Sequence, residues 1–154
     1  MSGTKLMTVE KLSWRCMSQW IGVTMKTITI HWQRLVNETG QTCPRCGYTG
    51  DTVQSAFDKL KKALAALDIE VRLKTSTLDF PMFEQNPLQS NRILIAEKPL
   101  EKWLGATVGQ SPCSGVCANA ECRTLSIGGK TFEEIPETLI IRAGLLAAAE
   151  IFSL

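Results

Sequence analysis

The chain has 154 residues, 44% of them hydrophobic, which is enough for one globular domain with a buried core. Lys and Arg number 17 against 15 for Asp and Glu, so the formal net charge is +2, and no long basic run appears. We therefore expect no nucleic-acid partner. No apolar run approaches the roughly 20 residues of a membrane helix, and the first residues lack the hydrophobic stretch of a secretory signal. These features predict a cytoplasmic protein with no membrane partner.

The chain contains six cysteines, and one of them, Cys16, lies in a segment unlike the rest. In a cytoplasmic protein, cysteines are more often metal ligands or catalytic thiols than parts of a disulfide framework. Residues 1–24 show no clean hydrophobic period, whereas a strongly patterned segment begins at Met25. We expect residues 1–24 to form a loosely held N-terminal extension that includes Cys16. Residues 25–154 are expected to form the folded domain.

The first part of the domain has the pattern of a strand, a helix and a second strand. Apolar and polar side chains alternate over residues 27–33 and again over residues 69–74, as in half-buried strands. Between them, apolar side chains recur at helical spacing, and Asp51 with Gln54 forms a capping box that predicts the start of this helix. Strand, helix and strand with short connections predict parallel pairing through a right-handed crossover.

The second part of the domain is predicted to contain six segments. In order they are an irregular segment, a strand, a short helix, a Cys-rich loop, a hairpin and a final helix (residues 75–90, 92–96, 98–106, 107–121, 123–135 and 136–151). The hairpin is expected to turn at Gly128 and Gly129, because paired glycines supply the positive φ angles of tight turns. The whole order is β-α-β followed by β-β-α, with a Cys-rich insertion before the last hairpin. This predicts an α/β protein with a two-layer thioredoxin-like fold, in which the loop after the first strand is the functional loop.

Four stretches of the sequence resemble a small prokaryotic family of thioredoxin-like domains of unknown function. They are TCPRCGYTG at 42–50, SNRILIAEKPLEKWLGA at 90–106, SPCSGVCANAECRTL at 111–125 and IPETLIIRAGLLAAA at 135–149. The resemblance runs from about Met25 to Phe152. It implies a thioredoxin-like fold and it implies no activity.

Two features distinguish the sequence from the thioredoxins themselves. In those enzymes the C-x-x-C pair opens the first helix, whose N-terminus lowers the pKa of the attacking thiol. Here four residues separate Cys46 from the expected N-cap at Asp51. Thioredoxins also place a cis-proline before the third strand, where this sequence has Ser90 and Asn91. The late helix start predicts weaker activation of Cys43 than in a thioredoxin, and both features count against a simple oxidoreductase.

The cysteine pair of the first loop fits two kinds of chemistry. As a redox dithiol, Cys43 would attack a disulfide and Cys46 would resolve the mixed disulfide, with protein thiols as partners. Arg45 between them would favour thiolates, although a solvated position in the turn is the alternative. We lean towards this thiol-disulfide redox activity, because the fold and the position of the motif agree on it. If the protein is an enzyme, it is then a thiol-disulfide oxidoreductase.

Metal binding is the alternative, because three further cysteines follow the first pair. Cys113, Cys117 and Cys122 have the irregular spacing C-x3-C-x4-C, and the topology predicts that they meet Cys43 and Cys46 at one end of the sheet. Zinc takes four such ligands in a tetrahedron, and thiolates equally suit Cu(I) or arsenite. The protein would then be a metal or metalloid binder with soft metal ions as partners, held by Cys43, Cys46 and two of Cys113, Cys117 and Cys122. A third option is an interaction module with a structural zinc.

Overall fold

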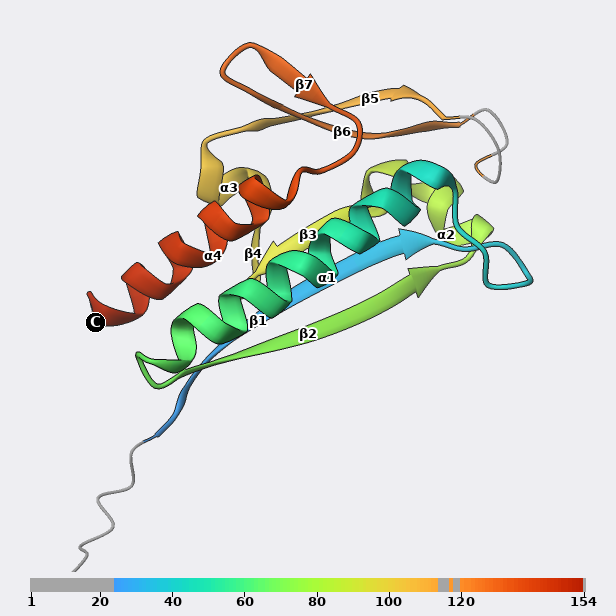
Figure 1. Cartoon of the computed structure of the whole chain (residues 1–154). Helices are drawn as coiled ribbons and strands as arrows, with labels where there is room; N and C mark the ends of the chain where they lie inside the picture. The colour runs from blue at the N-terminus through green and yellow to red at the C-terminus, as the bar shows by residue number, and fades with distance from the viewer. Residues whose placement is uncertain (1–23, 114–116, 118–119, 154) are drawn as a thin grey trace, which may run out of the picture.

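The structure of the protein is a computed structural model, which describes residues 24–113, 117 and 120–153. Its elements follow in the order β1 (Lys26–Leu35), α1 (Pro44–Ala65), β2 (Ile69–Leu78), α2 (Phe80–Gln85), η1 (Pro87–Gln89), β3 (Arg92–Ile95), β4 (Lys98–Pro99), α3 (Leu100–Leu104), β5 (Thr107–Pro112), β6 (Glu121–Ile127), β7 (Lys130–Phe132) and α4 (Glu137–Phe152) (Figure 1). Cys16 lies outside the described residues. No helix in the described part of the chain is long and apolar enough to cross a membrane.

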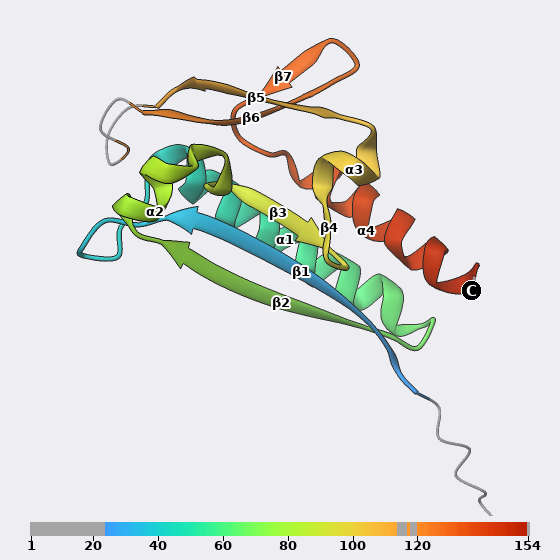
Figure 2. The same cartoon turned by 180° about the vertical axis from the view of Figure 1, so that it is seen from behind.

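The central sheet has four strands in the order β2-β1-β3-β4. β1 runs parallel to β2 and antiparallel to β3, so that Ile30 lies opposite Leu73 on one side and Ile95 on the other. Seen from behind, these strands lie in front of α1 (Figure 2). The predicted β-α-β unit is therefore confirmed, and the protein has a mixed α/β fold compatible with two layers.

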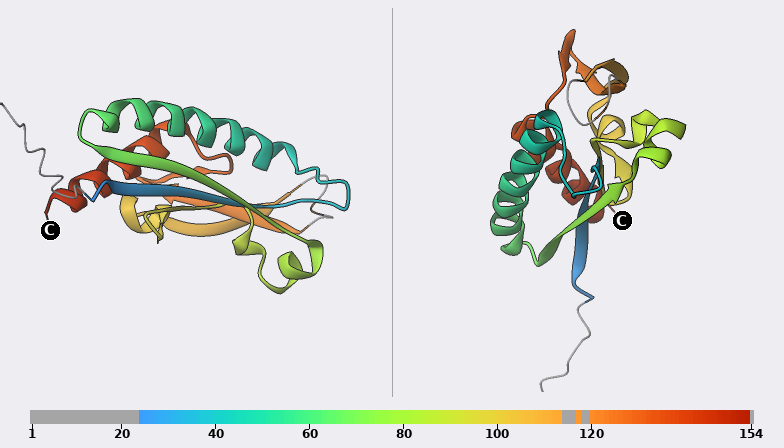
Figure 3. Two further views of the ribbon diagram at one scale, coloured as in Figure 1. Left: turned by 90° about the horizontal axis from the view of Figure 1, so that it is seen from below. Right: turned by 90° about the vertical axis from the view of Figure 1, so that its right-hand side faces the viewer.

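The core lies between this sheet and the helices on one of its faces. Along β1, the side chains of Ile28, Ile30 and Trp32 are buried, whereas His31 points to the other face and bonds to the Ser76 hydroxyl at 2.8 Å. α1 packs along the sheet and α4 packs against α1, with further contacts to β1 and β3. α2 lies on the opposite side from α1 (Figure 3). The alternation of β1 thus separates a buried apolar face from a polar one.

The hairpin does not pair with the third strand, although a thioredoxin-like fold places its fourth strand beside the third. The hairpin turns at Gly128 and Gly129 as expected, but its strands β6 and β7 form a second sheet with β5, in the order β5-β6-β7. β5 occupies part of the segment predicted as a loop and pairs with β6 along its length. The edge of β3 is taken instead by β4, after a tight turn in which Ala96 and Glu97 both have positive φ. The second sheet lies over the first turns of α1 (Figure 1).

The start of the first helix also differs from the prediction. α1 begins at Pro44 with Cys43 as its N-cap, seven residues before Asp51. A proline suits the first turn because its missing N–H would have no partner there. Cys43, the first cysteine of the C-x-x-C pair, therefore lies at the N-terminus of α1, contrary to the prediction.

Residues 75–90 are likewise more regular than predicted, because Asp79 caps α2 by accepting from the Met82 N–H at 2.9 Å.

Candidate functional site

Three thiols from two distant parts of the chain form one buried cluster. The Sγ atoms of Cys43, Cys113 and Cys117 all lie within 4.8 Å of one another, and the contact between Cys43 and Cys113 is 3.7 Å. Each of the three side chains is at most 5% exposed. These separations are far longer than the roughly 2.05 Å of a disulfide bond, so the sulfur atoms are in contact without being bonded.

The two remaining cysteines of the predicted site take different places. Cys122 lies beside the cluster, with its Sγ 3.3 Å from that of Cys117. Cys46 is fully buried one helical turn after Cys43, and its Sγ lies 3.8 Å from the Ser90 hydroxyl. The structure therefore brings the first cysteine of C-x-x-C towards the insertion and turns the second towards the start of β3.

The electrostatic environment of Cys43 is set by the neighbouring thiols and by its position at the N-terminus of α1. Its Sγ accepts the backbone N–H of Cys46 at 3.5 Å, in the manner of an N-cap side chain. Hydrogen bonds from Cys117 and then from Cys46 lower the pKa of the Cys43 thiol to about 2, against the opposing effect of burial. Cys43 is thus a thiolate at neutral pH, and the positive end of the helix macrodipole also favours that charge.

The other thiols divide into one that ionises near neutral pH and three that keep their protons. A hydrogen bond with Cys117 lowers the pKa of Cys122 to about 7, with a smaller contribution from the Arg45 charge. The same bond raises the pKa of Cys117. Burial raises the pKa of Cys113 to about 12, and the thiolate of Cys43 raises that of Cys46. The cluster therefore combines thiolate acceptors with thiol donors.

Arg45 joins the start of α1 to the second sheet. Its guanidinium donates to the Ser111 hydroxyl at 2.9 Å and to the Pro112 carbonyl at 3.2 Å, and it forms an ion pair with Glu133 at 3.0 Å. The Arg45 side chain is only 10% exposed. Arg45 is therefore not a solvated turn residue, because it holds the strand that leads to Cys113 against the helix that begins at Cys43.

A second buried arginine fixes the strand that carries Cys122. Arg123 donates to the Leu88 carbonyl at 2.8 Å and pairs with the Glu101 carboxylate at 2.7 Å. The side chains of this pair are 8% and 15% exposed, so water screens their attraction little. We call β5, β6 and the described residues between them the β5–β6 arm. The two arginines anchor this arm at two points.

A polar network supports the first turns of α1 from behind. Asn91 accepts from the Trp32 indole N–H at 3.2 Å and donates to the Thr49 hydroxyl at 3.2 Å. The same hydroxyl accepts the N–H of Ile135, next to the start of α4. Since all these atoms are buried, each bond satisfies a group that water cannot reach. The sequence pattern does not predict this role of Asn91. Asn91 and Ser90 stand where thioredoxins have a cis-proline.

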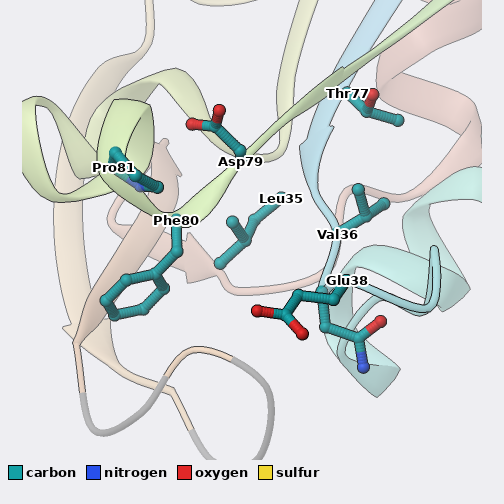
Figure 4. Close-up of a pocket in the computed structure, with 8 residues that line it drawn as sticks. Leu35, Val36, Glu38, Thr77, Asp79, Phe80 and Pro81 are labelled. Atoms are coloured by element: carbon teal, nitrogen blue, oxygen red, sulfur yellow. The ribbon is translucent and has the colours of Figure 1, made fainter.

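A cavity of about 560 Å³ lies at the carboxyl ends of β1 and β2 rather than at the thiols (Figure 4). Leu35, Val36, Phe80 and Pro81 form its apolar walls, and Glu38 and Asp79 add carboxylates. No cysteine is among its lining residues in the described part of the chain. A smaller cavity of about 230 Å³ reaches the cluster, since Arg45, Cys113 and Glu133 line it.

The fold and the site define the class of protein: a mixed α/β domain with a buried thiol cluster. The chain belongs to the family described as Domain of unknown function (DUF2703), whose model matches residues 28–144. It is 38% identical over 113 residues to a protein of Archaeoglobus fulgidus described as "Uncharacterized protein", over 73% of this chain and 82% of that protein. No solved structure matches the chain. The resemblance to a family of unknown function is thereby confirmed.

Proposed function

We propose that the protein binds a soft metal or metalloid ion through the thiolates of Cys43, Cys113 and Cys117. The observation that carries this proposal is the mutual proximity of the three Sγ atoms, all within 4.8 Å. A zinc–thiolate bond is about 2.3 Å long, so three sulfurs around one ion lie about 3.8–4.0 Å from one another. The three sulfurs need to move by only a few tenths of an ångström to share an ion.

The donor set limits the class of ion. Three sulfur ligands and no described oxygen or histidine ligand in the group favour Zn²⁺, Cu(I) or trivalent arsenic over Mg²⁺ or Ca²⁺. The sulfurs are buried, which protects a bound ion from competing water but hinders attack on a bulky disulfide substrate. Burial therefore supports ion binding over exchange with protein disulfides.

The test is to measure ion binding by variants that differ at single thiols. Protein purified anaerobically without chelator would be analysed for metal, then stripped and titrated with Zn²⁺ and with arsenite. We expect one ion per chain, lost in Cys43→Ser, Cys113→Ser and Cys117→Ser and kept in Cys46→Ser. Cys46→Ser is the matched control, because Cys46 is equally buried but faces Ser90. A wild-type chain that binds neither ion would overturn the proposal.

Thiol-disulfide redox activity is the second candidate, and the N-cap position of Cys43 favours it. A thiolate at the start of a 22-residue helix is the arrangement expected of an attacking cysteine. If this is the function, the ion-free protein will reduce a small disulfide, and Cys43→Ser will lose that activity while Cys117→Ser keeps it. Activity that is unchanged in Cys43→Ser would exclude the assigned nucleophile. A tightly held zinc with no such activity would instead identify an interaction module with a structural zinc.

A further inference from the structure

We propose that oxidation of Cys117 and Cys122 to a disulfide expels the bound ion, so that the site releases its ion in response to peroxide. This inference rests on the proposed ion binding. Its basis is that Cys117 takes part in two arrangements at once. Its Sγ belongs to the three-sulfur group with Cys43 and Cys113, and it also lies 3.3 Å from the Sγ of Cys122.

The Sγ atoms of Cys117 and Cys122 lie 3.3 Å apart, compared with 3.7 Å between those of Cys43 and Cys113. Closing it to the roughly 2.05 Å of a disulfide requires a shift of little more than an ångström. Cys122 lies outside the group of three mutually close sulfurs. A bond to Cys122 therefore takes Cys117 out of the ion site and leaves only Cys43 and Cys113.

The chemistry balances with hydrogen peroxide as the oxidant. The Cys122 sulfur attacks one peroxide oxygen, the O–O bond breaks, and a sulfenic acid and one water form. The electron pair that Cys117 shared with the ion then attacks the sulfenic sulfur, the S–O bond breaks, and the hydroxide leaves as water after taking up a proton. One thiol, one ion-bound thiolate, one peroxide and one proton thus give one disulfide, two waters and the free ion. The two sulfurs lose two electrons and the peroxide gains them.

All five described cysteines are buried, so only a small oxidant can reach their sulfurs, and the cavity beside the cluster opens on Cys113 and not on Cys122. The cavity of about 230 Å³ is lined by Arg45, Cys113 and Glu133. A water occupies about 30 Å³ of liquid, so the cavity has room for a molecule as small as peroxide. A protein disulfide is too large for it. The site therefore favours a small oxidant over a partner protein.

Zinc release by variants of the full chain tests the inference. Wild type, Cys122→Ser, Cys122→Ala and Cys46→Ser would each be loaded with one equivalent of Zn²⁺ and treated with peroxide. A chromogenic chelator would follow release, and peptide mass spectrometry would map the disulfide. We expect wild type and Cys46→Ser to release zinc as the Cys117–Cys122 bond forms. Release should slow on the order of tenfold or more in both Cys122 variants, which lack the resolving thiol. A dithiol reductant should restore binding.

Two Cys122 variants are used because serine and alanine differ in polarity at this fully buried position, so that one can fold if the other does not. Equal release from wild type and a folded Cys122 variant would overturn the inference, as would a disulfide that joins Cys43 to another cysteine. Loss of zinc binding in both folded Cys122 variants would also overturn it, because Cys122 would then be a ligand. A wild-type chain that binds no ion would overturn the proposed function and this inference with it. The first three outcomes leave ion binding by the wild type intact.

Discussion

The sulfur of Cys43 lies 3.7 Å from the sulfur of Cys113, although 70 positions separate the two residues in the chain. The first caps α1, and the second follows β5 in a different sheet. The cluster therefore exists only where the body of the domain meets the β5–β6 arm.

Ion binding should release two protons per chain near neutral pH. The pKa of Cys43 is lowered, so this ligand is already a thiolate, whereas burial and hydrogen bonding raise the pKa values of Cys113 and Cys117 and keep both protonated. An ion needs thiolates, so it must displace both protons. Protons therefore compete with the ion, and affinity should rise by about two log units per pH unit between about pH 6 and 8. Calorimetry in buffers of different ionisation enthalpy measures the number, and a value of zero would contradict the assignment.

Arg45→Gln should weaken ion binding by up to about thirtyfold while the domain stays folded. The change removes two hydrogen bonds to the arm, from Arg45 to Ser111 and Pro112, each of which contributes about 1 kcal/mol. Arg142→Gln is the matched control, because it makes the same charge change on the exposed side of α4. Titration with zinc compares the two affinities. An equal loss in both variants would show a general charge effect rather than an anchor for the arm.

Gly50→Ala should destabilise the protein, and Gly47→Ala in the same helix should not. A Cβ at Gly50 would lie 2.5 Å from Cη2 of Trp32, whose ring is buried and bonded to Asn91. Such overpacking typically costs about 1–3 kcal/mol. A Cβ at Gly47 would meet nothing within 4 Å, so alanine there should stabilise α1 by about 0.5–1 kcal/mol. Urea unfolding measures both changes, and a Gly50→Ala chain as stable as wild type would refute the close packing.

Glu101→Gln should cost about 3 kcal/mol of unfolding free energy, because it leaves the buried Arg123 guanidinium without its counter-charge. The control is Glu70→Gln, which breaks an exposed pair with Arg72 whose side chains are 38% and 63% exposed. Water screens that pair, so the control should change stability little. Thermal unfolding of the two variants makes the comparison. Equal effects would mean that the Arg123–Glu101 pair is better solvated than its burial indicates.

The parts of the fold that follow local patterns could be predicted from the sequence. The alternation in β1 and β2, the glycine turn between β6 and β7 and the proline before α4 each depend on neighbouring residues. The start of α1 could not be predicted in this way, because Gly47 and Gly50 look like loop residues. Gly50 is in fact a contact point for Trp32 on another element. The strand β5 contains Gly109 and Pro112 and forms through its pairing with β6.

The candidate site could be predicted in composition but not in arrangement. The six cysteines indicated thiol chemistry, and the topology predicted that the insertion would approach Cys43 and Cys46. The second sheet determines which thiols lie in contact, and no local sequence pattern predicts that sheet. The irregular spacing of Cys113, Cys117 and Cys122 gave no template for choosing three ligands. Cys43 and Cys46 contact different neighbours because Cys43 is the N-cap, with an extended backbone, whereas Cys46 lies inside the first turn of α1.

The two-point attachment of the β5–β6 arm has a kinetic consequence. The arm supplies two of the three proposed ligands, and Arg45 and Arg123 hold it against α1, η1 and α3. Detaching the arm would break these contacts and expose the buried Leu125 of β6, whereas the four-stranded sheet pairs without the arm. Such a local opening needs less free energy than global unfolding. The residence time of a bound ion would then be set by how often the arm opens, and the strength of the two arginine anchors would regulate that rate.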